Sequence, residues 1–451
     1  MSENYLTFPI DSRSTEWLAG KGLRMALLRT EDETYAPWME AINRGFHEPR
    51  PTAEFIRERG TKAPHRRMTG VWDATIADAR SPIATASCWP TELTVPGARS
   101  ITSWAISTLT VAPTHRRRGV ASAMLEAELR TAQALGIPMA ILTASEATIY
   151  RRWGFAPAAM IADWTIDPRR VKWTGPQASG RVQYVDAEQI LLDGHAIVEA
   201  ARLATPGLIH FDGQLWERLL GVGDDELGRR LRFLRYDDAA GAPQGFAVYS
   251  VLKDTTHSGR SIIEVRYLSA TTDEAYAGLW RFLFELDLVG EVRAPMRPAE
   301  EPFAWQISDY RAAVKSNEHD HLWARILDVP AALEARRYSA PGRMVFEVAD
   351  PLGFAAGQWL LDVGQDGVGT VTKLADGAAP ATASPAAAPP AATAASVISL
   401  GVNELGSLYL GGVSAALLAR AGTIAERTAG AAAVVDAAFR SDVTPWLSIW
   451  F

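Results

Sequence analysis

The sequence predicts an α/β protein with α+β character, built from several domains, and three observations lead to this class. The chain has 451 residues, more than one ordinary hydrophobic core accommodates. Apolar residues form 48% and charged residues 22% of it, as in globular proteins. Strand-like and helix-like periodicities alternate through residues 1–157, and the same order returns in 158–304. Residues 305–451 differ in character, so three domains with these boundaries are expected.

The first domain alternates between apolar runs with strand periodicity and runs with helical periodicity. Its longest strand is followed by a helix on which Leu125, Leu129 and Ala132 share one face. Gly136 follows this helix, where a C-terminus favours left-handed backbone. In chain order the predicted elements are a helix at 34–46, strands at 69–76, 83–89 and 101–111, a helix at 121–135, a strand at 139–142 and a short helix at 146–152.

The second domain repeats this order, with strands predicted at 231–236, 245–252 and 262–268 and a helix at 273–288. The connection into that helix, residues 269–272, contains neither glycine nor arginine. We interpret the domain as a second copy of the same fold that cannot hold a pyrophosphate. An unrelated α/β domain with a chance similarity is the alternative.

The third domain begins with a run at 322–336 that we predict to be helical. Strands are expected at 345–348 and 358–363, followed by a hairpin turn at Asp366-Gly367. Residues 377–395 consist of Ala, Pro, Thr, Ser and Gly, which cannot build a core. The remaining tail is short for an independent domain, so this Ala/Pro-rich tract is predicted to be a loop within the third domain.

Residues 111–121 contain the most informative motif. Arg116, Gly119 and Ala121 form the pattern Arg-x-x-Gly-x-Ala between a strand and a helix. The first backbone N–H groups of a helix have no internal partner and attract anions. The spacing fits neither the P-loop nor the dinucleotide fingerprint. A basic surface turn or a nucleic-acid patch is the alternative, and the net charge of −7 disfavours nucleic acid.

The loop resembles the pyrophosphate loop of the GNAT N-acetyltransferases, which bind acetyl-CoA. In such a fold, the strand end at 109–111 can pair through its backbone with the pantetheine amide. Acetylation also needs a base for the amine and an acid for the departing thiolate. Tyr150 keeps its proton at pH 7 because a phenol has a pKa of about 10. A packing tyrosine is the alternative from the residues alone, whereas the resemblance implies that Tyr150 donates a proton to the sulfur.

No carboxylate–histidine pair identifies the base. His115 lies in the anion loop and is expected to be exposed. Glu40, Glu48 and Glu92 have no distinguishing pattern. The chain instead ends on apolar and aromatic residues. Because an apolar tail is usually buried, the α-carboxylate of Phe451 would be carried inside, where a carboxylate needs partners or a task.

Taken together, these features resemble the enhanced intracellular survival (Eis) family of acetyltransferases over nearly the whole chain. The motifs that carry the similarity are residues 111–119, Ala144-Ser145-Glu146, Ile149-Tyr150, Gly154-Phe155, Leu322-Trp323, Arg325-Ile326, 329–336, 405–411 and 436–439. The resemblance implies tandem GNAT domains, of which the N-terminal one is active and the central one degenerate, and a C-terminal sterol-carrier-like (SCP2-like) domain. It also implies a homohexamer of two trimers.

The same resemblance implies an N-acetyltransferase in which an amine of an aminoglycoside or of a lysine side chain attacks acetyl-CoA directly. Tyr150 would be the general acid, and the carboxylate of Phe451 would be the general base, through water. The residues implied to contact acetyl-CoA are Leu109, Val111, Arg116, Arg117, Gly119, Val120 and Ser145. Trp450 stands where members can have an acidic residue, and Thr108 where an aromatic can line the substrate pocket. Both departures can weaken the binding of a polycationic amine, and Glu48 can restore negative charge.

Composition excludes several other classes. The single cysteine, Cys88, excludes an intramolecular disulfide and a thiolate metal cluster, and its apolar surroundings predict a core residue. No metal is expected. Neither a signal-peptide pattern nor a membrane-spanning apolar run is present, so a cytoplasmic location is expected. The alternative function is a non-enzymatic protein that binds a lipid or small molecule through the third domain.

Overall fold

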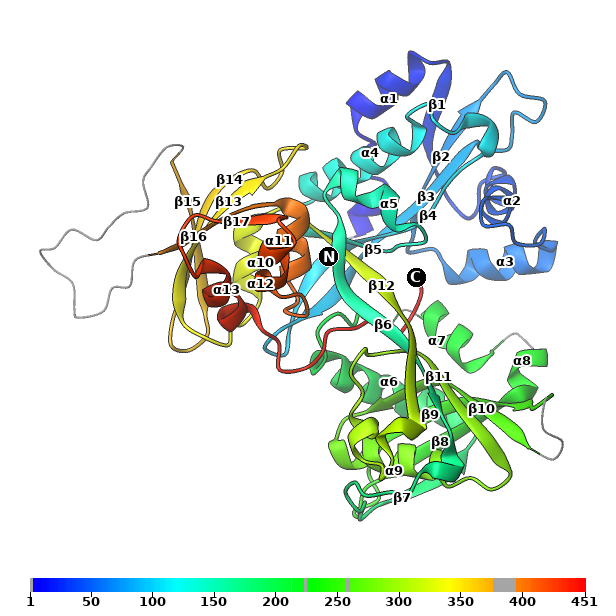
Figure 1. The fold of residues 1–451 in the computed structure, drawn as a ribbon. Coiled ribbons are helices and arrows are strands. Elements are labelled where there is room, and N and C mark those ends of the chain that lie inside the picture. Colours follow the sequence, from blue (N-terminus) through cyan, green and yellow to red (C-terminus); the bar gives the residue numbers. More distant parts are fainter. Residues whose placement is uncertain (1–2, 212, 223–224, 256–259, 376–394) are drawn as a thin grey trace, which may run out of the picture.

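The computed structural model describes residues 3–211, 213–222, 225–255, 260–375 and 395–451. These residues form three lobes, which Figure 1 shows in blue to cyan, in green, and in yellow to red. One twelve-stranded sheet runs through the first and second lobes, in the order β1-β2-β3-β4-β5-β12-β6-β11-β10-β9-β8-β7. A five-stranded sheet, β15-β14-β13-β16-β17, forms the third lobe. All but the last residue of the predicted loop 377–395 lies outside the described residues.

The first lobe confirms the predicted order of helices and strands. Strands β1 to β4 are antiparallel, and β5 returns parallel to β4 after helix α4. Gly136 follows α4 with a φ of 71°, as its position predicted. The elements are α1 (Ser12–Ala19), β1 (Leu23–Leu28), α2 (Tyr35–Gly45), α3 (Ala53–Lys62), β2 (Arg67–Asp73), β3 (Ala84–Val95), β4 (Arg99–Val111), α4 (Val120–Ala134), β5 (Met139–Thr143), α5 (Ala147–Tyr150) and β6 (Ala156–Ile166).

The central lobe repeats this topology, which confirms the second copy of the fold. Strands β7 to β10 are antiparallel, and β11 returns parallel to β10 after helix α9. Helix α9 ends at Phe284, four residues before its predicted end. The elements are β7 (Arg181–Val185), α6 (Ala187–Leu203), α7 (Gly213–Leu220), α8 (Asp225–Arg230), β8 (Leu231–Asp237), β9 (Pro243–Lys253), β10 (Ser261–Ala270), α9 (Asp273–Phe284) and β11 (Val289–Arg297).

The prediction of a helix at 322–336 is wrong for residues 322–326. Residues up to Ile326 belong to β12 (Ala313–Ile326), and helix α10 (Val329–Ala335) begins three residues later. Strand β12 lies between β5 and β6 in the middle of the sheet, so residues 321–326 are all buried. A strand buried on both faces lacks alternation, and its apolar run cannot be distinguished from a buried helix by periodicity.

The third lobe has the strands predicted at 345–348 and 358–363. The turn at Asp366-Gly367 joins two antiparallel strands, and Gly367 has a φ of 72°, which confirms the predicted hairpin. The elements are β13 (Gly342–Ala349), β14 (Gly357–Val363), β15 (Gly369–Leu374), β16 (Ser396–Gly401), α11 (Val402–Leu408), α12 (Ala415–Arg420), β17 (Ile424–Glu426) and α13 (Ala431–Phe439).

The C-terminal segment leaves the third lobe and returns to the junction of the other two (Figure 1). The amide of Trp446 donates to the carbonyl oxygen of Pro206 at 3.1 Å. Trp446, Leu447 and Ile449 are buried, as the apolar character of the tail predicted. No helix among the described residues is long and apolar enough to cross a bilayer.

Candidate active site

The first lobe contains an opening between two parallel strands. Strand β4 pairs with β5 only where Ser103–Ala105 faces Met139–Ile141, although β4 continues to Val111. Beyond this point β4 has an extra residue, because Ser107 faces Ser87 and Thr110 faces Thr85. Thr108 takes up the extra residue with a φ of 52°, and Thr85 Oγ1 donates to its carbonyl oxygen at 2.8 Å. Such a bulge bends the strand and leaves the backbone of the β4 end available to a ligand amide on the β5 side.

The predicted anion loop lies at the start of helix α4, directly after this opening. Gly119 is the N-cap residue, with a φ of 81° and no side-chain cap on the helix. The first N–H groups of α4 therefore remain available to an anion. The side chains of Arg116 and Arg117 are exposed beside them. A Cβ at position 119 would lie 2.5 Å from the Trp17 ring, so the positive φ and this close approach both favour glycine here.

His115 differs from its expected exposure. It is 5% exposed and joins the loop to the end of β2. Its Nε2 lies 3.1 Å from Asp73 Oδ2, and its Nδ1 lies 2.8 Å from Thr114 Oγ1. Hydrogen bonds from Thr75 and then from His115 lower the pKa of Asp73 to about 2. His115 therefore fixes the shape of the loop rather than facing solvent.

Tyr150 lies on α5, the short helix that follows β5. It is 8% exposed, and the rings of Trp153, Phe155 and Trp323 surround it. Burial raises the pKa of its phenol, a hydrogen bond with Ser145 lowers that pKa, and the charge of Glu146 raises it. The net shift is upward, so the phenol keeps its proton at neutral pH and remains able to donate it.

The end of the chain reaches the same end of β5. Thr143 Oγ1, on the last residue of β5, donates to the terminal oxygen of Phe451 at 3.4 Å. The Phe451 ring packs edge-on against Trp89 at a centroid distance of 5.7 Å. Helix α5 begins four residues after Thr143, so Tyr150 and Phe451 lie near the same end of β5 although they are distant in the sequence.

His321 is a buried residue of this region that the sequence analysis missed. Its Nε2 lies 2.8 Å from the carbonyl oxygen of Ile449, and its ring packs edge-on against Trp450 at 4.5 Å. Burial lowers the pKa of its imidazole to about 4. No local pattern marks this residue, and the wrong helix assignment for 322–336 concealed its position beside the tail.

The candidate carboxylates differ in their surroundings. Glu40 pairs with Arg50 at 2.9 Å. Glu92 accepts hydrogen bonds from Ser100 and Thr102, both at 2.8 Å. Glu48 is exposed on the connection between α2 and α3. Two of these three groups are therefore held by neighbours in the first lobe.

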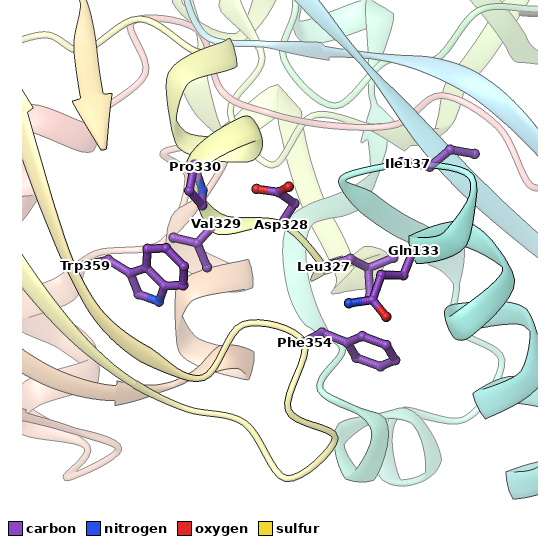
Figure 2. Close-up of a pocket in the computed structure, with 9 residues that line it drawn as sticks. Gln133, Ile137, Leu327, Asp328, Val329, Pro330, Phe354 and Trp359 are labelled. Atoms are coloured by element: carbon purple, nitrogen blue, oxygen red, sulfur yellow. The ribbon is translucent and has the colours of Figure 1, made fainter. Parts of the chain in front are cut away.

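Cys88 is buried in the core, as predicted. In the described ranges, no group of three or more His, Cys, Asp and Glu side chains is placed to hold a metal ion. A cavity of about 250 Å³ lies between the C-terminal end of α4 and the start of α10. Figure 2 shows residues that line it. Its one carboxylate, Asp328, accepts from the amide of Ala331 and caps α10. This cavity holds no group placed for acyl transfer.

The open β4–β5 pair, the uncapped glycine start of α4 and the buried tyrosine after β5 define a CoA-dependent acetyltransferase of the GNAT class. Residues 27–158 and 207–326 both match the acetyltransferase (GNAT) domain, and residues 329–448 match the sterol carrier protein domain. An uncharacterized N-acetyltransferase of Streptomyces avermitilis is 34% identical over 428 residues, which cover 92% of this chain and 96% of that protein.

Two further relatives have names that identify a particular family. N-acetyltransferase Eis of Mycobacterium tuberculosis is 33% identical over 365 residues, covering 78% of this chain and 81% of that protein. The crystal structure of Eis1 from Mycobacterium abscessus superposes with a TM-score of 0.78 and 28% identity, over 95% of this chain and all of that one. The chain belongs to the Eis family of GNAT N-acetyltransferases, and its acyl donor is acetyl-CoA.

Proposed function

We propose that this enzyme acetylates primary amines of aminoglycoside-like polyamines or of lysine side chains. In this proposal Tyr150 is the general acid and the carboxylate of Phe451 is the general base. The observation that carries it is the approach of both residues to the end of β5, beside the opening between β4 and β5.

The donor is held by the first lobe. The backbone of Leu109 and Val111 pairs with the pantetheine amide, because among the described residues that edge of β4 has no strand partner on the β5 side. The pyrophosphate binds the first N–H groups of α4 at Gly119 and Val120, with the guanidinium groups of Arg116 and Arg117 nearby. Ser145, which follows β5, is the remaining proposed contact.

The chemical step uses these groups as follows. The amine nitrogen attacks the acetyl carbonyl carbon, which forms the C–N bond and breaks the C–S bond to the thiolate of CoA. The amine loses its proton to the Phe451 carboxylate through a water molecule. The Tyr150 phenol gives its proton to the departing thiolate, so that CoA leaves as a thiol.

The experiment measures the release of free thiol from acetyl-CoA by the full chain. Kanamycin, neomycin, spermidine and a lysine peptide serve as acceptors, and their kcat/KM values distinguish a polyamine from a protein substrate. Tyr150→Phe removes only the phenol oxygen and is expected to lower kcat by roughly 10²-fold or more. Tyr184→Phe, at an exposed tyrosine of the central lobe, is the matched control.

Two variants test the base. Deletion of Phe451 removes both the ring and the carboxylate, whereas the addition of one glycine after Phe451 keeps the ring and moves the carboxylate. Both are expected to lower kcat strongly and to leave acetyl-CoA binding unchanged. Full turnover by the extended chain would refute the carboxylate as the base, and the absence of turnover with every acceptor would refute the substrate class.

The alternative is a protein that binds a lipid or small molecule through the third domain. The cavity against the third lobe in Figure 2 holds about 250 Å³, below the roughly 300–1,000 Å³ of ordinary small-molecule sites. The three-domain boundaries and the homohexamer expected from the resemblance remain part of the proposal. Limited proteolysis tests the boundaries, and sedimentation velocity of the full chain measures the assembly.

A further inference from the structure

The central lobe contains its own opening, which encloses a cavity of about 1030 Å³. Strand β10 pairs with β11 only across Ser261–Glu264 and Val289–Arg293, although both strands continue beyond this region. The ends of the two strands and the start of α9 line the cavity. Its volume is that of a site for a ligand of drug-like size. The degenerate domain has therefore kept the opening of the fold while losing the anion loop.

The start of α9 is unsuited to a phosphate. Thr272 Oγ1 already accepts from the amide of Ala275 at 3.1 Å. The carboxylates of Asp273 and Glu274 occupy the first turn, where they oppose an incoming anion. This helix start therefore differs from the glycine start of α4, and the ligand of the central cavity is not expected to be a second CoA.

Aromatic rings line the cavity and its surroundings. Trp305 is 80% exposed and Tyr310 53% exposed, and their ring centroids lie 5.1 Å apart. Trp446, from the C-terminal segment, is buried in the wall and carries the guanidinium of Arg297 over its ring at 4.7 Å. Exposed aromatic rings beside a cavity supply apolar contact area and bind cations over their faces.

The unpaired charges of the lining are negative. Arg297 is paired with Glu301, and Lys315 lies 2.8 Å from Glu318. Asp273, Glu300 and Asp442 also line the cavity, and within the described ranges no hydrogen bond or ion pair involves their side chains. The two cations are thus compensated, whereas three carboxylates remain available to a positively charged ligand.

Gln306 adds a further acceptor to this lining. Its Oε1 is buried and has no hydrogen-bond donor in the described part of the chain. A buried acceptor without a donor costs roughly 1–3 kcal/mol. The N–H of an ammonium ligand can satisfy it once the Gln306 side chain turns toward the cavity, whereas another anion would not.

We propose that the central cavity is a second ligand site that binds an organic ammonium ion with an apolar or aromatic body. The carboxylates of Glu300 and Asp442 attract its charge, and Trp305 and Tyr310 cover its body. This site goes beyond acetyl transfer, since the ligand here is bound and not modified.

Because the C-terminal segment lines the central cavity, a ligand bound there is expected to affect catalysis. Asp442, Val443, Thr444 and Trp446 line the cavity, and Phe451 lies five residues beyond Trp446. A ligand that displaces Trp446 moves the carboxylate of Phe451 away from Thr143. Occupancy is therefore expected to lower kcat, and this coupling rests on the proposed role of Phe451.

The test uses three benzyl compounds that cannot form a stable amide, so that binding is measured apart from turnover. N,N-dimethylbenzylamine is a cation with one N–H at pH 7, benzyltrimethylammonium is a cation without N–H, and benzylsulfonate is an anion. Calorimetric titration of the full chain is expected to show binding of the first, weaker binding of the second and none of the third. The double variant Glu300→Gln/Asp442→Asn is expected to weaken binding by about fivefold, and Trp305→Ala by about fivefold.

Glu188→Gln is the matched control, because Glu188 is an exposed carboxylate of the same lobe outside the cavity. Its affinity should equal that of the wild type. Equal binding of the sulfonate, or cation binding that survives both cavity variants, would overturn the proposal. A smaller sedimentation coefficient of Trp305→Ala would also overturn it, because the aromatic pair would then be a subunit contact.

The coupling is measured separately. Saturating N,N-dimethylbenzylamine is expected to lower kcat for acetyl transfer without changing the KM for acetyl-CoA. Binding without any effect on kcat would refute the coupling between the cavity and the C-terminal segment. The proposal of a ligand site in the central cavity would still stand. If the protein bound the ammonium compound but transferred no acetyl group, the proposed function would be refuted and the proposed ligand site would still stand.

Discussion

The Nε2 atom of His321 lies 2.8 Å from the carbonyl oxygen of Ile449, which ties β12 to the segment that carries Phe451. A carbonyl oxygen only accepts, so Nε2 carries the proton and donates. The side chain is fully buried, and burial lowers the pKa of the imidazole to about 4. His321 is therefore neutral at working pH and acts as a positioning residue for the tail.

Replacement of His321 tests this role. His321→Ala removes the hydrogen bond and the ring contact with Trp450, so the Phe451 carboxylate should move away from Thr143. A net loss of about 1 kcal/mol in tail positioning corresponds to a kcat roughly five- to tenfold lower. The KM for acetyl-CoA should be unchanged, because the donor loop lies on α4. His321→Gln restores a donor and should recover part of kcat, whereas equal kcat in all three proteins would contradict the positioning role.

The same residue predicts the acid stability of the protein. The folded pKa of His321, about 4, lies below its ordinary value of 6.5, so the unfolded chain binds more protons between these values. The stability contributed by the neutral imidazole is complete above pH 6.5 and is lost as the pH falls through 4. The loss is on the order of 3 kcal/mol. Between pH 7.5 and 4, the temperature of thermal unfolding should fall more steeply for the wild type than for His321→Gln. Parallel declines in the two proteins would contradict this role of His321.

The sequence was sufficient to predict the parts of the fold that depend on local chemistry. Gly119 and Gly136 mark the two ends of α4, and the apolar runs before and after this helix identified β4 and β5. The strand β12 could not be predicted in the same way, because its partners β5 and β6 precede it by more than 140 residues. Burial on both faces removed the alternation that would have distinguished it from a helix.

The candidate active site was likewise predictable only where it depends on local sequence. The anion loop and Tyr150 follow from the order strand, loop, helix and from the family resemblance. His321 and the central cavity could not be found, because each is assembled from distant segments such as β12, α9 and the tail. Trp305 and Trp446 are ordinary aromatic residues in the sequence, and only folding brings them to one cavity.

The glycine at the start of α4 allows a matched test of donor binding. Gly119→Ala places a Cβ 2.5 Å from the Trp17 ring, on a residue with a φ of 81°. The left-handed backbone alone costs roughly 1–2 kcal/mol, and the collision must be relieved by a shift of the Trp17 ring or of the loop. We expect a KM for acetyl-CoA raised about tenfold or more, with a smaller change in the KM for the amine.

Gly136 is the control for that variant, because it follows the same helix with a φ of 71° and a Cβ added there would meet no atom of the described part of the chain within 4 Å. Gly136→Ala should therefore lower the thermal stability by a similar strain and leave the KM for acetyl-CoA unchanged. If both variants raised the KM equally, the effect would come from general loosening of α4 and not from the loop.

A buried ion pair joins the third lobe to β12. Arg325, on β12, donates twice to the Asp350 carboxylate, at 2.8 Å each, and both side chains are fully buried. Asp350→Ala leaves the guanidinium without its partner in a dry environment, so a loss of about 3–5 kcal/mol in the free energy of unfolding is expected. Glu40→Ala removes the partner of Arg50, whose side chain is 80% exposed, and should cost about 1 kcal/mol or less.

Urea unfolding followed by tryptophan fluorescence measures both variants. The double variant Arg325→Met/Asp350→Leu removes both charges and should recover part of the stability that Asp350→Ala loses, because no buried charge remains. The recovery is incomplete because the amides of Leu352 and Ala355 lose the carboxylate that accepts from them. A loss in Asp350→Ala no larger than that in Glu40→Ala would show that water reaches Arg325. The attachment of the third lobe would then rest on its other contacts, such as the Arg151–Glu404 ion pair and the hydrogen bond from Asn403 to the carbonyl oxygen of Phe155.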